Sequence, residues 1–61
     1  MVPTDVYMLF SWCNTMLRDE YDSLEALCAA FELSQEDLTA RLAEIGYRYE
    51  EKTNRFVPIL R

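Results

Sequence analysis

The residues of this chain that could carry out chemistry are two cysteines and a small group of acidic side chains. Cys13 and Cys28 are the only thiols, and the chain contains no histidine. Because histidine is the commonest general base and triad partner, its absence removes most nucleophilic mechanisms. Both cysteines fall on apolar helix faces, where a thiol without a cationic neighbour acts as a small hydrophobic side chain. A disulfide would require the two helices to bring the sulfurs within bonding distance. We therefore predict that the chain is not an enzyme.

The pattern of possible ligands favours neither a metal nor a cofactor. Two distant cysteines without histidine match no zinc site. Asp19, Glu20 and Asp22 lack the glycine turn and spaced oxygens of a calcium loop, so we interpret them as a solvated helix end. Gly46 is the only glycine, which excludes a glycine-rich phosphate loop. We predict no metal, no cofactor and no small-molecule substrate.

A polar group near the end of the first apolar segment could form a network. Asn14 and Arg18 are four residues apart, so they share one helix face beside the apolar stripe. Asp19 and Tyr21 follow at the end of this segment. The group is either a structural network, in which Arg18 pairs with a carboxylate or with helix-end carbonyls, or a polar contact point for a partner. We favour the structural network.

Three amphipathic segments and a hairpin must position these side chains. Apolar residues recur at helical spacing in three stretches. The predicted helices cover about residues 6–18, 24–31 and 35–45. The predicted N-caps are Asp5, Asp22 or Ser23, and Ser34. Gly46 stands where a left-handed residue ends a helix.

After Gly46 the period changes from helical to alternating. Residues 47–50 alternate aromatic and charged side chains, as a half-buried strand does, and residues 55–57 can pair back on them. We predict a hairpin over about residues 47–57 with its turn at 51–54. Asn54 tolerates the positive φ that such a turn needs, and Glu50 would face Arg55 across the hairpin.

The first helix carries more apolar surface than a small core needs. Its apolar stripe is roughly 160° wide, and Met8 widens it further. Met8 and Trp12 lie one turn apart and form a candidate interface, because methionine and aromatic residues are enriched in interfaces. Alternatively, Trp12 covers the edge of a three-helix core. A 61-residue chain buries little surface alone, which favours association with itself or with another protein.

Three helices followed by a hairpin outline a winged helix-turn-helix, which raises nucleic-acid binding as an alternative. The candidate contacts are Gln35, Thr39, Arg48, Lys52 and Arg55. Charge counts against this function, because residues 1–45 carry a net charge of −7 and only residues 46–61 are basic, at +2. The outline alone does not establish DNA binding.

A set of residues spread over nearly the whole chain matches a known family. They are Pro3, Asp5, Leu9, Ser11, Asn14, Leu17-Arg18-Asp19, Tyr21, Ser23-Leu24, Leu27-Cys28, Leu42-Ala43, Ile45-Gly46-Tyr47, Tyr49, Asn54 and Phe56-Val57. In these residues the chain resembles the small bacterial proteins of domain of unknown function 4250. Val6 and Trp12 depart from the family pattern. The resemblance implies a bacterial, cytoplasmic protein and brings no known activity, cofactor or catalytic residue.

The sequence thus predicts one domain over residues 1–61, mainly α-helical with a C-terminal β-hairpin. The start of the chain lacks a basic region before its apolar stretch, and no run is long enough to span a bilayer. We expect a cytoplasmic protein with reduced thiols and no membrane partner. Its expected function is that of a non-catalytic interaction module, self-associating through the first helix, with the DNA-binding regulator as the alternative.

Overall fold

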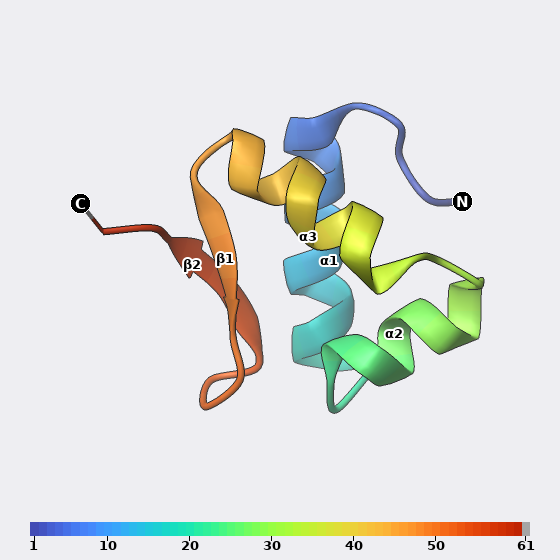
Figure 1. The fold of residues 1–61 in the computed structure, drawn as a ribbon. Helices are drawn as coiled ribbons and strands as arrows, with labels where there is room; N and C mark the ends of the chain where they lie inside the picture. The colour runs from blue at the N-terminus through green and yellow to red at the C-terminus, as the bar shows by residue number, and fades with distance from the viewer. Residues whose placement is uncertain (61) are drawn as a thin grey trace.

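Three helices and a C-terminal antiparallel hairpin make up the chain in the computed structural model, which describes residues 1–60 (Figure 1). The elements are α1 (Val6–Asp19), α2 (Leu24–Phe31), α3 (Gln35–Glu44), β1 (Tyr47–Glu50) and β2 (Arg55–Pro58). This confirms the predicted fold class, and each helix ends within one residue of its predicted bound. Arg61, the last residue of the basic segment 46–61, lies outside the described residues.

Each helix begins at a polar residue whose side-chain oxygen accepts a hydrogen bond from the backbone N–H three residues later. These N-caps are Asp5, Ser23 and Ser34, at 3.0, 3.0 and 3.2 Å. The sequence left the cap of α2 open between Asp22 and Ser23, and the structure uses Ser23. Such a cap contributes about 1 kcal/mol to stability, so the three caps fix where the helices start.

Between residues 1 and 60 the backbone turns through the left-handed region at three positions, of which two were predicted. Gly46 has φ 90° and Asn54 has φ 55°, as their residue types allow. The third position is Glu32, which ends α2 with φ 56°. The next residue, Leu33, donates its N–H to the carbonyl of Cys28 at 2.8 Å, which closes the helix end. The connection between α2 and α3 has only three residues, Glu32 to Ser34, which leaves no room for a wider turn, so a glutamate adopts this conformation.

The core lies around α1, which α3 crosses and against which α2 packs, while the hairpin contacts both α1 and the C-terminal end of α3 (Figure 1). Leu9 of α1, Leu27 of α2 and Leu42 of α3 are at most 1% exposed. The other buried apolar residues are Cys13, Leu17, Leu24, Cys28, Leu38, Phe56 and Val57. The buried leucines therefore confirm the helical periodicity read from the sequence.

The two strands pair in the predicted register. Tyr47 lies opposite Pro58, and Glu50 lies opposite Arg55 at the turn. Within residues 1–60, no helix has the length and apolar character needed to cross a membrane.

Candidate functional site

The hairpin is held to α1 by an asparagine that takes the place of a strand partner. Asn14 is half-buried on the side of α1 that faces β2. Its Nδ2 donates to the carbonyl of Phe56 at 3.2 Å, and its Oδ1 accepts from the N–H of Phe56 at 2.8 Å. A primary amide has one donor and one acceptor side, so it can pair with a peptide group as a neighbouring strand would. Asn14 therefore satisfies the Phe56 backbone on the outer edge of β2.

A second asparagine joins the turn of the hairpin to the end of α1. Asn54 Nδ2 donates to the carbonyl of Leu17 at 3.0 Å and to that of Tyr21 at 2.9 Å. The hydroxyl of Tyr49 donates to Asn54 Oδ1 and accepts from the N–H of Leu24 at 3.3 Å. The last carbonyls of a helix and its first N–H groups lack intrahelical partners, so these bonds satisfy the end of α1 and the start of α2.

Asn14, Tyr49 and Asn54 together form what we call the polar seam between α1 and the hairpin. Two of the residues predicted as a polar network contribute to it, Asn14 through its side chain and Tyr21 through its carbonyl. The sequence does not indicate Tyr49 as a member of this seam, and it predicts only a turn role for Asn54. The signal in the sequence was that Tyr49 and Asn54 are polar residues near the apolar Phe56. No local pattern in β1 or the turn, however, indicates which helix these two side chains contact.

The other two predicted network residues lie outside the seam. Arg18 Nε donates to Asp19 Oδ1 at 2.8 Å, and the two side chains are 73% and 46% exposed. The hydrogen bond and charge of Arg18 hold the pKa of Asp19 below its ordinary value, and the same bond raises the pKa of Arg18. An exposed pair of neighbours contributes little to stability, because water screens it.

The candidate interface residues on α1 have different environments. Met8 is 63% exposed, beside Tyr7 at 65%. Trp12 is half-buried, with its ring edge-on to Phe31 of α2 at 5.1 Å between centroids. On the opposite side of the stripe, Phe10 stacks on Tyr47 of β1 at 4.0 Å. Much of the wide apolar arc of α1 is thus used within the chain, between α2 and the hairpin.

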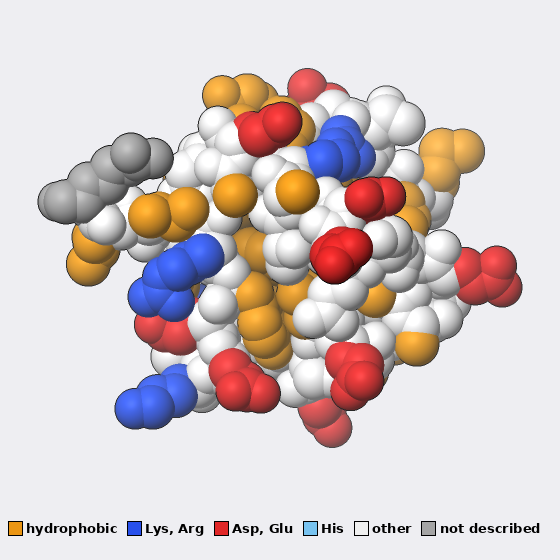
Figure 2. Space-filling view, in the orientation of Figure 1, with side chains coloured by type: hydrophobic (Ala, Val, Ile, Leu, Met, Phe, Trp, Pro, Cys, Tyr) orange, Lys and Arg blue, Asp and Glu red, His pale blue; other side chains and the backbone are white. Residues whose placement is uncertain are grey.

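The candidate nucleic-acid residues of α3 do not form a basic surface. Gln35 is exposed between Ser34 and two exposed carboxylates, Glu36 and Asp37. The Thr39 hydroxyl donates back to the carbonyl of Gln35 at 2.9 Å. In Figure 2, acidic side chains are spread over the visible face, while basic ones lie mainly towards the hairpin.

The hairpin carries the remaining candidates for nucleic-acid contact. Arg48, Lys52 and Arg55 are exposed. Arg48 Nη2 lies 3.7 Å from Glu50 Oε2, and Arg55 lies opposite the same glutamate across the strands. The hairpin therefore presents mixed charge, with Glu50 placed between two arginines.

The two thiols are buried and free. Cys13 is 0% and Cys28 4% exposed. Burial raises the pKa of Cys13 to about 12, with a further contribution from neighbouring Cys28, and burial also raises the pKa of Cys28. Protonated thiols are poor nucleophiles, so neither is activated at neutral pH. Within residues 1–60, no three His, Cys, Asp or Glu side chains come together as a metal site would require.

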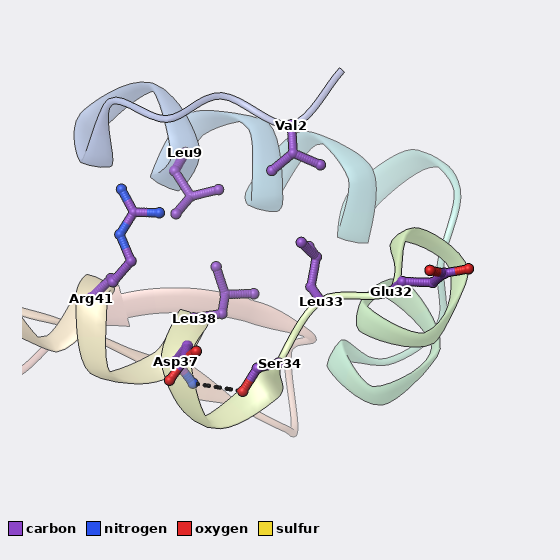
Figure 3. A pocket seen from close by; sticks show the side chains of 8 residues that line it. All are labelled: Val2, Leu9, Glu32, Leu33, Ser34, Asp37, Leu38 and Arg41. Carbon is purple, nitrogen blue, oxygen red and sulfur yellow. Dashed lines mark hydrogen bonds between the residues drawn. The ribbon is translucent and has the colours of Figure 1, made fainter.

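A cleft of about 260 Å³ lies between the N-terminal segment, α1 and α3 (Figure 3). Leu9, Leu33, Leu38 and Val2 line it, with Glu32, Ser34, Asp37 and Arg41 at its rim. Nη2 of Arg41 donates to the carbonyl of Thr4, which holds the N-terminal segment beside α3. The sequence does not indicate this cleft, because the cleft depends on where the N-terminal segment folds back.

Comparison with known proteins gives a family but no function. The model of the family described as Domain of unknown function (DUF4250) matches residues 3–56. Neither the curated proteins nor the solved structures gave a match. The matched range contains all three helices, β1, the turn and Asn54, and therefore the three residues of the polar seam. The chain accordingly belongs to the family of Domain of unknown function (DUF4250).

Proposed function

We propose that the protein is a non-catalytic interaction module that self-associates through the outward side of α1. The observation that carries this proposal is an uncharged helix surface on an otherwise charged chain. Residues 6–17 contain no charged side chain, although 28% of the whole chain is charged. The exposed residues of this stretch are Tyr7, Met8, Ser11 and Thr15.

An uncharged surface of this kind suits a protein contact. The central parts of interfaces are depleted in charged residues and enriched in tyrosine and methionine. Tyr7 and Met8 are two of the large apolar side chains that remain well exposed on the folded chain. Trp12, which is half-buried, lies one helical turn from Met8 on α1. Burying these side chains would add apolar contacts that a 61-residue domain cannot supply within its own core.

A second copy of the chain is the occupant that fits this surface. The chain carries a net charge of −5, so two copies repel each other over most orientations. The uncharged side of α1 is where two copies can approach without placing carboxylates against carboxylates. Closed dimers are the commonest oligomers and use the same surface patch on both subunits.

Sedimentation at increasing protein concentration tests this proposal. Met8→Glu places a carboxylate in the contact and should lower the apparent mass at each concentration. Ala30→Glu adds the same charge at an exposed position of α2 and should leave the mass as in the parent chain. Trp12→Ala should weaken both association and folding, because Trp12 also packs on Phe31. A parent chain that stays monomeric at high concentration contradicts the proposal.

Nucleic-acid binding is the second candidate, and the exposed Arg48, Lys52 and Arg55 of the hairpin favour it. The carboxylates at the start of α3 disfavour it, because that end would approach phosphates. Titration with mixed-sequence duplex DNA at low salt tests it. Binding that falls steeply with salt and drops on Arg55→Ala would support this function, whereas no detectable binding at low salt removes it.

In either role, we take the protein to be bacterial and cytoplasmic, as the family resemblance implies.

A further inference from the structure

The hydrogen-bond pattern of the hairpin identifies which backbone groups point away from it. In an antiparallel pair, residues alternate between pairs that exchange hydrogen bonds and pairs that do not. Phe56 directs both its N–H and its carbonyl to Asn14. Phe56 and its strand partner Tyr49 are therefore a pair that exchanges no backbone hydrogen bonds. The N–H of Ile59 donates to the carbonyl of Gly46 at 2.8 Å, one residue beyond the pair of Tyr47 with Pro58. Both observations show that the pairs of Tyr47 with Pro58 and of Tyr49 with Phe56 exchange no backbone hydrogen bonds, whereas the pairs between and beside them do.

The two outer edges of the hairpin therefore differ. On β2, Asn14 satisfies the backbone of Phe56, and Pro58 has no N–H. On β1, the N–H and carbonyl groups of Tyr47 and Tyr49 point outward, and in residues 1–60 no hydrogen bond joins them to the rest of the chain. An open strand edge is a template for pairing with another strand.

We propose that β1 pairs antiparallel with β1 of a second copy, with Tyr49 opposite Tyr49 of the other chain. The two Tyr49 backbones would exchange a pair of N–H to carbonyl hydrogen bonds, and the two hairpins would form one four-stranded sheet. This contact is separate from the proposed contact through α1 and does not depend on it. A chain with both contacts forms a dimer through either one and a tetramer of dihedral symmetry through both.

The side chains beside Tyr49 make this register self-complementary. With Tyr49 at the centre, Arg48 of each copy lies opposite Glu50 of the other. Cβ atoms in such directly opposite pairs are about 4.5–5.5 Å apart, so opposite charges attract and like charges repel. Arg48 and Glu50 are already on one side of β1, with N and O atoms 3.7 Å apart and side chains 51% and 33% exposed. A second β1 thus offers a carboxylate to each arginine and an arginine to each carboxylate.

Charge reversal on β1 tests this pairing in a background that removes the α1 contact. Met8→Glu is placed in every chain, and sedimentation and native mass spectrometry report the mass. Adding Arg48→Glu sets carboxylates opposite carboxylates, and adding Glu50→Arg sets arginines opposite arginines. Each variant alone should dimerise about tenfold more weakly than the background chain.

Mixing the two charge-reversed variants distinguishes a contact between chains from an effect within one chain. In the mixture, every charge on one β1 lies opposite its complement on the other, so heterodimers should form about as tightly as the background dimer. Loss of the ion pair within a single chain cannot be restored by mixing. Far-UV circular dichroism confirms that each variant is folded, and an 15N-labelled chain should show slower hydrogen exchange at the Tyr49 amide on dimerisation. Three results would each overturn the proposal. The background chain could be monomeric, the Arg48→Glu variant could dimerise as tightly as the background chain, or the mixture of the two variants could stay monomeric.

Discussion

The two sides of α1 are held by different physical means. Towards α2 and α3, the contact is made by buried apolar side chains such as Leu9, Leu27 and Leu42. Towards the hairpin, Phe10 and Phe56 also pack, but side-chain amides bind backbone groups in the polar seam. Apolar contacts are non-directional, whereas a hydrogen bond requires a defined distance and angle. The helical side therefore supplies most of the folding free energy, and the seam fixes where the hairpin lies.

This difference explains why a hairpin of two four-residue strands keeps one position. An isolated two-stranded hairpin is at best marginally stable in water. Asn14 and Asn54 bind it at two points, one at β2 and one at the turn, with Tyr49 joining the turn to α2. A shift of the hairpin by one residue would leave half-buried amides unpaired, which costs more than the bonds themselves contribute.

Replacing Leu27 by alanine should have the largest effect, because it removes a fully buried side chain from the helical side. We expect a loss of about 2–5 kcal/mol in the free energy of unfolding. A single core of this size supplies only about 3–5 kcal/mol, so much of the variant should be unfolded. Urea titration followed by circular dichroism measures the loss. Leu60→Ala, at an 87% exposed position, is the control and should change stability by less than about 0.5 kcal/mol.

Replacing Asn14 by alanine should have a smaller and more local effect. The change leaves the N–H and carbonyl of Phe56 without their partner, at a cost of about 1–3 kcal/mol. Native-state hydrogen exchange should show faster exchange at Phe56, with less change in the middle of α2. Thr15→Ala, at the next and exposed position of α1, should change neither quantity. Equal acceleration at Phe56 and Leu27 would mean that the seam and the apolar core are one cooperative unit.

The same contrast separates what the sequence predicts from what it does not. The helices and the hairpin follow from periodicity and from residues with local roles, such as Ser34 at an N-cap and Gly46 at φ 90°. The seam does not follow, because Asn14 and Phe56 are 42 residues apart and no local pattern pairs them. Glu32 at φ 56° was likewise missed, because its residue type gives no sign of left-handed backbone.

Trp12 illustrates the limit for a single side chain. Its helical position places it at the border of the apolar stripe, where a core edge and an interface give the same pattern. The contact of its ring with Phe31 depends on the angle between α1 and α2, which the sequence pattern does not give. Periodicity gives a face of a helix, but the crossing angle depends on side-chain packing between helices.

The buried thiols allow a test of the apolar side through pH. The pKa of Cys13 is about 12 in the folded chain against an ordinary value of 9.0, so above pH 9.0 only the unfolded state releases this proton. The stability that the raised pKa provides is complete below pH 9.0 and falls by about 1.4 kcal/mol per pH unit above it, until the folded pKa is reached. Urea titrations of the parent chain and of Cys13→Ala at several alkaline pH values measure the difference. The two chains differ only at position 13, so parallel pH dependence of their free energies of unfolding would show that Cys13 is not shielded.

The smallest effect is expected at Arg18, which lies beside the polar seam in the sequence but outside it in the structure. Its hydrogen bonds go to Asp19 at the surface, and its side chain is 73% exposed. Arg18→Ala should leave the urea midpoint unchanged at moderate salt, and Asp19→Ala should behave alike, because solvent and ions screen this pair. If Arg18→Ala instead lowered the midpoint as much as Asn14→Ala, the guanidinium would contribute to holding the end of α1. A small change of the urea midpoint in Arg18→Ala and a clear change in Asn14→Ala would show that the seam ends between these two positions. They are one helical turn apart, but the Asn14 side chain binds backbone groups, whereas the Arg18 side chain lies in water.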